Sequence, residues 1–424
     1  MIRVHQLVLP GLALFALTFC LACSEHNFVT CDITQRACQE DIYYRMLKLR
    51  GDGYDPFGGL PPMTVISEDQ FRQQLEQEAA TTQSHQTPLD KLWDKVMVLL
   101  HFTSAAPAQG GVDGGADGGT SGDAGTSTSA IDDEVTHIYA FYDPQSKTVT
   151  VISHPNQTGA AAQAENMITL AHELVHALQD RELNLKKTDF NTSDEYYAYD
   201  TIIEGDARFY EYLFTKDLCP LIPQCQSATS PAQELEDYWS HFDQLGSPLF
   251  AARALIYPLG SKYEDTAYQS GGNAAVRHAY AKAPARMVGF LVGSDGHVPS
   301  VGTGSVCPAP VALALAPTKD TMGADQFGAL LVYTFLRGWK VSHDLAFATA
   351  QTWTGDFLRV QASSDYRTSA AAWRIEFSTP PPPAIAQALT VSGELTVTAD
   401  KGALLITVSD STTPLTWTAP TNCP

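Results

Sequence analysis

Apolar residues recur at helical spacing over much of the chain, which predicts a largely helical protein. The clearest case is "PLDKLWDKVMVLLHF" (88–102), where the apolar positions fall three and four residues apart. Similar patterns predict further helices at 40–49, about 163–181, 194–218, 234–245, 248–283, 324–339 and 344–353.

Two parts of the chain alternate apolar and polar residues instead. The segment 134–153 alternates on both sides of "DPQSK", which carries turn residues, so we predict a β-hairpin there. After the proline-rich "TPPPPA", the segments 389–399 and 403–409 predict short strands.

One segment, 104–130, has almost no apolar side chains and consists largely of Gly, Ser, Thr, Asp and Ala. Such a stretch cannot bury enough surface to offset the entropy of ordering, so we predict a disordered loop without a function of its own.

The first residues have the features of an export signal. A run of 13 apolar residues follows "MIRVHQ" and is too short to span a membrane. The "CLACS" after it resembles a bacterial lipoprotein signal, with Cys23 as the acylated residue; a plain secretory signal is the alternative. In either case we expect an exported protein, in the first case anchored by lipid in the bacterial cell envelope.

Cysteine usage agrees with export. Apart from Cys20 and Cys23, six cysteines remain, an even number that suggests disulfides in an oxidising compartment. The simplest pairing joins 31 with 38, 219 with 225 and 307 with 423, among fifteen connectivities for six cysteines.

The net charge of -21 argues against anionic partners. Such an acidic field repels nucleic acid and anionic membrane surfaces, so we expect no nucleic-acid ligand and membrane contact only through the lipid anchor.

The strongest chemical signal is "HELVH" at 172–176. His172 and His176 are four residues apart on a predicted helix, so their imidazoles lie on one face where a tetrahedral zinc requires them. Glu173, beside the pair, can reach a water on that metal. Two histidines on a buried helix without metal are the alternative interpretation.

A third ligand follows in "TIIEGDARFYEYL", where Glu204 lies on a second predicted helix. Two histidines and one carboxylate are a typical catalytic zinc set. HELVH followed by EGDA resembles the gluzincin metallopeptidases, whose third ligand is a glutamate in a motif such as NEGxA. Ile203 stands here at the position of the asparagine.

A closer resemblance covers about 166–377. The chain is similar to a group of bacterial and archaeal gluzincin-like envelope proteins with four ordered blocks, which appear here as "HELVHALQD", "EGDA", "GGNAAVRHAYAKAP" and "WTGD". The segment "ARMVGFLVGSDGHVP" departs from that group, which usually has "STEQ…HP" there.

The resemblance implies peptide-bond hydrolysis with one Zn²⁺ per chain and a peptide or protein substrate. Zinc would activate a water, and Glu173 would act as general base. Asp180 and Asp206 are candidates to orient an imidazole, although solvated or helix-start roles are equally compatible with the sequence. For the oxyanion donor we favour Tyr280 over His278, Tyr257 and Tyr263, because a matched block contains it.

The expected fold is α+β: a mainly helical gluzincin-like domain, with a short β-hairpin or edge sheet before the HExxH helix and a small β-rich C-terminal tail. The expected order is signal 1–22, tether and helical segment 23–103, loop 104–130, zinc metallopeptidase-like domain 131–377 and tail 378–424. The alternative function is a catalytically silent zinc-binding lipoprotein that acts as a binding or assembly factor. Trp353 and Asp356 are expected to cap and pack C-terminal helices.

Overall fold

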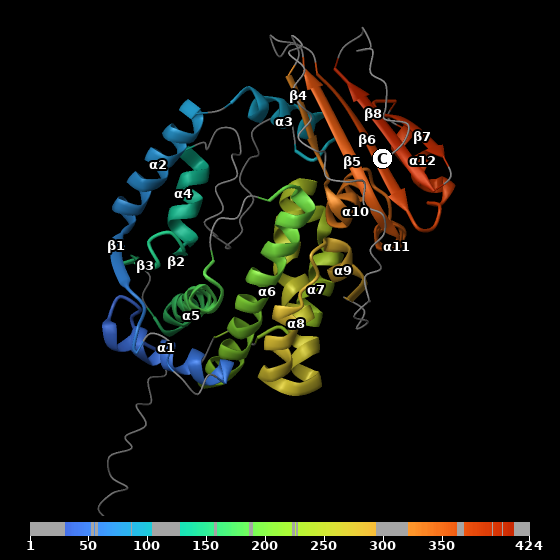
Figure 1. Ribbon diagram of the computed structural model, residues 1–424. Coiled ribbons are helices and arrows are strands. Elements are labelled where there is room, and N and C mark those ends of the chain that lie inside the picture. Colours follow the sequence, from blue (N-terminus) through green and yellow to red (C-terminus); the bar gives the residue numbers. More distant parts are fainter. Residues whose placement is uncertain are drawn as a thin grey trace, which may run out of the picture.

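The computed structural model is an α+β protein with two small sheets, as the sequence predicted (Figure 1). It describes residues 30–51, 55, 58–85, 87–103, 128–156, 159–185, 190–222, 225, 228–293, 321–362, 369–391, 393–400 and 402–410. The helices of this part of the chain are α1 (Arg36–Arg50), α2 (Glu68–His85), α3 (Pro88–Leu99), α4 (Thr128–His137), α5 (Ala160–Leu183), α6 (Ser193–Leu218), α7 (Pro231–Ser240), α8 (Pro248–Ala281), α9 (Met287–Gly293), α10 (Gly328–Gly338), α11 (His343–Gln351) and α12 (Pro383–Thr390).

The first sheet has three strands in the order β1-β3-β2 and packs against α5. Strands β2 (Ala140–Asp143) and β3 (Thr148–Ser153) are the predicted hairpin. Strand β1 (Met63–Ser67), which the sequence analysis missed, pairs with β3 in parallel. Strand β2 is therefore an edge strand, and it lies next to the helix that carries HELVH.

Helix α6 joins two hydrophobic cores. Its first half contributes side chains such as Ile202 and Ile203 to the core around α8, α10 and the second sheet. Its second half contributes side chains such as Phe209 and Phe214 to the core around α1 and α5. Glu204 lies at the change between the two cores, so both of them fix its position.

The second sheet has five antiparallel strands in the order β4-β5-β6-β8-β7. They are β4 (Thr321–Asp325), β5 (Trp353–Ala362), β6 (Ser369–Phe377), β7 (Thr396–Asp400) and β8 (Ala403–Ser409). The segment 403–409 is a strand as predicted, but of the strand predicted at 389–399 only the end, from Thr396, is one, and its first two residues belong to α12. Both strands join a sheet that begins at residue 321, and this sheet crosses the boundary predicted at 377. The "WTGD" block connects β5 to the start of α10, because Asp356 accepts the backbone N–H groups of Phe327 and Gly328 there.

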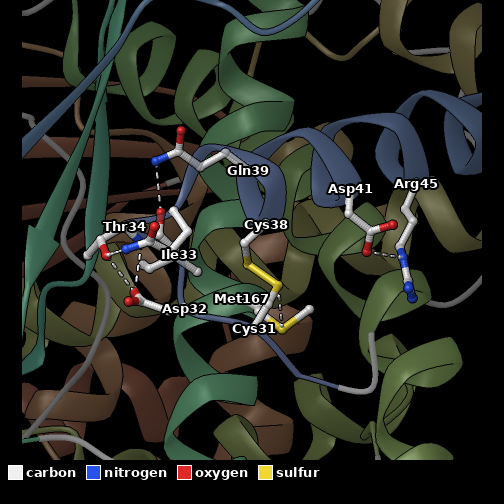
Figure 2. Close-up of a disulfide and its surroundings, with 10 residues drawn as sticks. Cys31, Asp32, Ile33, Thr34, Cys38, Gln39, Asp41, Arg45 and Met167 are labelled. Carbon is white, nitrogen blue, oxygen red and sulfur yellow. Dashed lines mark hydrogen bonds and ion pairs between the residues drawn. A yellow bond between two sulfur atoms is a disulfide. The ribbon is translucent and has the colours of Figure 1, made fainter. Parts of the chain in front are cut away.

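Two of the three predicted disulfides are present, Cys31–Cys38 and Cys219–Cys225 (Figure 2 shows the first). Cys307 and Cys423 lie outside the described residues, as do the predicted signal and Cys23. Most of the predicted loop also lies outside them, whereas its last three residues, from Thr128, belong to α4. Among the described residues, no helix combines the length and the apolar character needed to cross a membrane.

Candidate metal centre

Helix α5 carries the two histidines and Glu173 into the interior. Every residue from Leu170 to Asp180 is buried, which is the pattern of a helix packed on all sides. His172, Glu173 and His176 are between 4 and 6% exposed, and one ligand atom from each lies within 4.8 Å of the others. They form a buried group that could hold a metal ion.

Glu204 of α6 faces the same point. Its Oε2 lies 3.3 Å from Nε2 of His172 and 3.3 Å from Nε2 of His176. Four tetrahedral ligands, each about 2.0–2.1 Å from a zinc ion, lie about 3.3–3.4 Å from one another. Both distances therefore match two edges of a zinc tetrahedron.

Two sets of three ligands share the histidines, one completed by Glu173 and the other by Glu204. In the set with Glu204, the two distances from Oε2 to the histidine nitrogens match edges of the tetrahedron. Glu173 is also engaged elsewhere: its Oε2 accepts the backbone N–H of Tyr142 at 2.7 Å.

A carboxylate sets the tautomer of His172. Nδ1 of His172 lies 3.0 Å from Oε2 of Glu211, which also pairs with Arg208. Burial works against the charged form of Glu211, but Arg208 and His172 together outweigh it and lower the pKa of the carboxyl. An ionised carboxylate only accepts hydrogen bonds, so Nδ1 carries the proton and Nε2 turns its lone pair to Glu204.

An amide sets the tautomer of His176. Nε2 of Gln179 donates to the carbonyl of Ile203 and to Oδ2 of Asp206, both at 2.9 Å. Because both acceptors lie on that side, the amide oxygen faces Nδ1 of His176, at 2.8 Å. In the neutral ring Nδ1 is therefore the donor, and Nε2 of His176 holds the lone pair that a metal would bind.

The electrostatics of the group favour a cation. Burial disfavours the charged form of His176, but the attraction of Glu204 outweighs it and raises the pKa of His176 to about 9. Burial also acts against the carboxylate of Glu204, yet the two histidines hold its pKa well below the usual range. A positive charge at this point, a proton or a metal ion, is thus stabilised.

Glu173 differs from Glu204 in the direction in which its pKa is shifted. Burial raises the pKa of Glu173, and the two histidines only partly oppose this shift. A carboxylate with a raised pKa that is fixed through one oxygen has the properties of a general base.

Asp180 and Asp206 do not contact an imidazole directly. Oδ2 of Asp180 accepts the hydroxyl of Tyr142 at 2.6 Å, which fastens α5 to β2. Asp206 reaches His176 only through Gln179.

The four candidates for the oxyanion donor lie in different surroundings. The ring of Tyr257 lies 6.4 Å from that of His172, centroid to centroid. The hydroxyl of Tyr280 is buried without a hydrogen-bond partner among the described residues, and the charges that act on it belong to Asp206, Arg50 and Glu264. His278 is exposed, and Tyr263 donates to the carbonyl of Ala279. Tyr257 is therefore the candidate beside the site.

Three groups at the site were not predicted from the sequence: Glu211, Gln179 and the backbone amide of Tyr142. Two of these had a signal: Gln179 lies three residues after His176, and Glu211 lies seven after Glu204, so each shares a helix face with a ligand. The Tyr142 amide had none, because backbone groups carry no sequence pattern.

Comparison of the chain with protein-family models, curated proteins and solved structures found no match. The interpretation of the site therefore depends on its own geometry.

Proposed function

We propose that this protein is a zinc-dependent metallopeptidase of the gluzincin type, with His172, His176 and Glu204 as ligands and Glu173 as general base. The observation that carries the proposal is the pair of 3.3 Å distances from Glu204 to two imidazole nitrogens whose lone pairs face it. A purely structural zinc site has no need of the buried, fixed Glu173 beside it.

The residues have separate tasks. When bound, zinc supplies Lewis acidity for the scissile carbonyl and lowers the pKa of water toward about 7. Glu173 is held through Oε2 by the Tyr142 amide, so Oε1 is the oxygen that takes the proton of the water and delivers it to the leaving nitrogen.

Tyr257 is the proposed donor to the oxyanion, in place of Tyr280, because its ring is near that of His172, with the ring centroids 6.4 Å apart. Tyr257→Phe should lower kcat about 10²–10³-fold. Zinc content should not change, and an unchanged kcat would exclude this role.

The edge strand β2 supports a peptide substrate. The N–H of Ile152 donates to the carbonyl of Tyr139 at 2.8 Å, so the alternating ladder turns the backbone groups of Ala140 and Tyr142 away from β3. The amide of Tyr142 meets Glu173, which brings this edge to the catalytic carboxylate. An extended peptide that adds to such an edge would lie beside the metal.

We also propose that the protein is exported and anchored through a lipid on Cys23. The sequence "CLACS" and the two disulfides support export, since disulfides persist in oxidising compartments. Metabolic labelling with a clickable fatty acid should mark the wild type and not Cys23→Ser; equal labelling would contradict the anchor.

The test of the function is hydrolysis of a fluorogenic peptide library by the purified protein and by Glu173→Gln. We expect cleavage by the wild type that a chelator abolishes and zinc restores, and none by Glu173→Gln at equal zinc content. Equal cleavage by both proteins would contradict the mechanism. Zinc binding without any cleavage would favour the alternative, a silent zinc-binding factor.

A further inference from the structure

Arg50 is the last residue of α1, directly after the helix predicted at 40–49, and it is only 5% exposed. Its Nη1 lies 2.8 Å from Oδ2 of Asp206, and its guanidinium stacks 4.7 Å from the ring centre of Tyr210. An arginine is buried in this way only when its charge is paired, so α1 is built into the protein interior.

The partner of Arg50 is the residue that orients Gln179. Oδ2 of Asp206 accepts from Arg50 and from Nε2 of Gln179, whose oxygen faces Nδ1 of His176. A continuous row of three hydrogen bonds thus links the end of α1 to a proposed metal ligand. A carboxylate only accepts, so its position decides which side of the Gln179 amide turns to His176.

Both ends of α1 are fixed, which makes the row stiff. At its start, the Cys31–Cys38 disulfide lies against α5, with Sγ of Cys31 3.9 Å from Sδ of Met167 (Figure 2). At its end, side chains of α8 bind the carbonyls of its last two residues: Nδ2 of Asn273 donates to Leu49 at 2.8 Å and Nη1 of Arg277 to Arg50 at 3.1 Å.

We propose that Arg50 is a positioning residue of the metal centre, which acts through Asp206 and Gln179 to hold His176 with its Nε2 lone pair toward the metal. Helix α1 is then a structural part of the centre. The inference rests on the zinc site proposed above.

The first test is the zinc affinity of Arg50→Gln in the full chain, measured by competition with a chromophoric chelator. Loss of a residue that orients a metal ligand typically weakens binding about 10–100-fold, and we expect about 10-fold here because Arg50 acts at a distance. Arg36→Gln is the matched control, because Arg36 lies on the same helix and pairs with Glu40 on the surface. The zinc affinity of this variant should equal that of the wild type.

A second test separates positioning from general stabilisation. In the metal-free protein at a pH above about 9, where the ring of His176 is neutral, ¹⁵N NMR of the histidines should show a pyridine-like Nε2 for His176 in the wild type and in Arg36→Gln. In Arg50→Gln both tautomers should appear. Arg50→Lys, whose ammonium can still reach Asp206, should recover part of the wild-type affinity and is the milder variant if Arg50→Gln does not fold.

A double-mutant cycle with Gln179→Met tests the route. Because the effect passes through Gln179, Arg50→Gln should cost little additional affinity in the Gln179→Met background. Additive losses, or an unchanged affinity and tautomer in Arg50→Gln, would overturn the inference. If the wild type binds no zinc, the proposed function fails, while the NMR measurement on the metal-free protein still decides the role of Arg50.

Discussion

Helices α6 and α8 touch through two glycines, and an added methyl group there should disrupt the metal centre. A Cβ on Gly205 would lie 2.3 Å from Cα and C of Gly260, and a Cβ on Gly260 would lie 1.9 Å from the carbonyl oxygen of Thr201. All of these are backbone atoms, which cannot turn away as a side chain can. Gly205 also directly follows the proposed ligand Glu204.

The size of the effect follows from these distances. Non-bonded carbon atoms settle at about 3.5–4.0 Å, so Gly205→Ala must separate the helices by at least about 1 Å. Metal–ligand distances tolerate only about 0.2 Å, so a shift of this size in Glu204 removes it from the ligand set. Overpacking should also cost about 1–3 kcal/mol in the free energy of unfolding, which exceeds the gain of about 1 kcal/mol from replacing a helical glycine with alanine.

The assay is zinc affinity by chelator competition, with urea unfolding of the metal-free protein. We expect Gly205→Ala and Gly260→Ala both to lose at least about 100-fold in affinity. Gly293→Ala, where a Cβ meets nothing within 4 Å, is the control and should bind as the wild type does. Wild-type affinity in Gly205→Ala would refute the argument that the helix crossing positions Glu204.

Three further predictions follow from the described contacts. Glu211→Gln should weaken zinc binding about 10–100-fold in the same chelator assay, because the carboxylate that orients His172 is lost; an unchanged affinity would exclude this role. Asp356→Ala should destabilise the fold by at least about 4 kcal/mol in urea unfolding, since four buried donors lose their acceptor, and a loss below about 1 kcal/mol would contradict it. Burial raises the pKa of Asp194 from 3.8 to about 7, with Asp356 adding to the shift. The folded state therefore keeps a proton that the unfolded chain has lost, so stability should fall as pH rises from about 4 to about 7. Urea midpoints of the metal-free protein should show a shallower fall in Asp194→Asn, and an equal fall would assign the titration to other groups.

The spacing of residues along the sequence was sufficient to predict which side chains of a single helix lie together. The four-residue separation of His172 and His176 predicts two imidazoles on one face, and the structure brings both to the same point. The prediction of Glu204 depended on the EGDA motif as well, because spacing alone does not relate two helices. Only the packing of α6 on α5 shows that its carboxylate reaches the histidines.

Contacts between residues that are distant in the sequence could not be predicted from it. Arg50 meets Asp206 from 156 residues away, and no periodicity in either segment indicates the pair. Asp180 has the right helical spacing for an imidazole contact, but β2 offers the hydroxyl of Tyr142, which binds it instead. Strands β5 and β6 are central strands of their sheet, and their alternation of apolar and polar residues is short. It begins only after "WTGD" in β5 and after "SAAA" in β6, so neither strand was predicted.

The most direct test of the account is the metal content of the purified protein, measured by mass spectrometry for four forms of the chain. We predict about one zinc per chain in the wild type and in Glu173→Gln, and none in His176→Ala or Glu204→Gln. That result would establish Glu204 as the third ligand and leave Glu173 free to act as the base. A wild type without metal after addition of zinc, or a Glu204→Gln variant that retains zinc while Glu173→Gln loses it, would contradict the account.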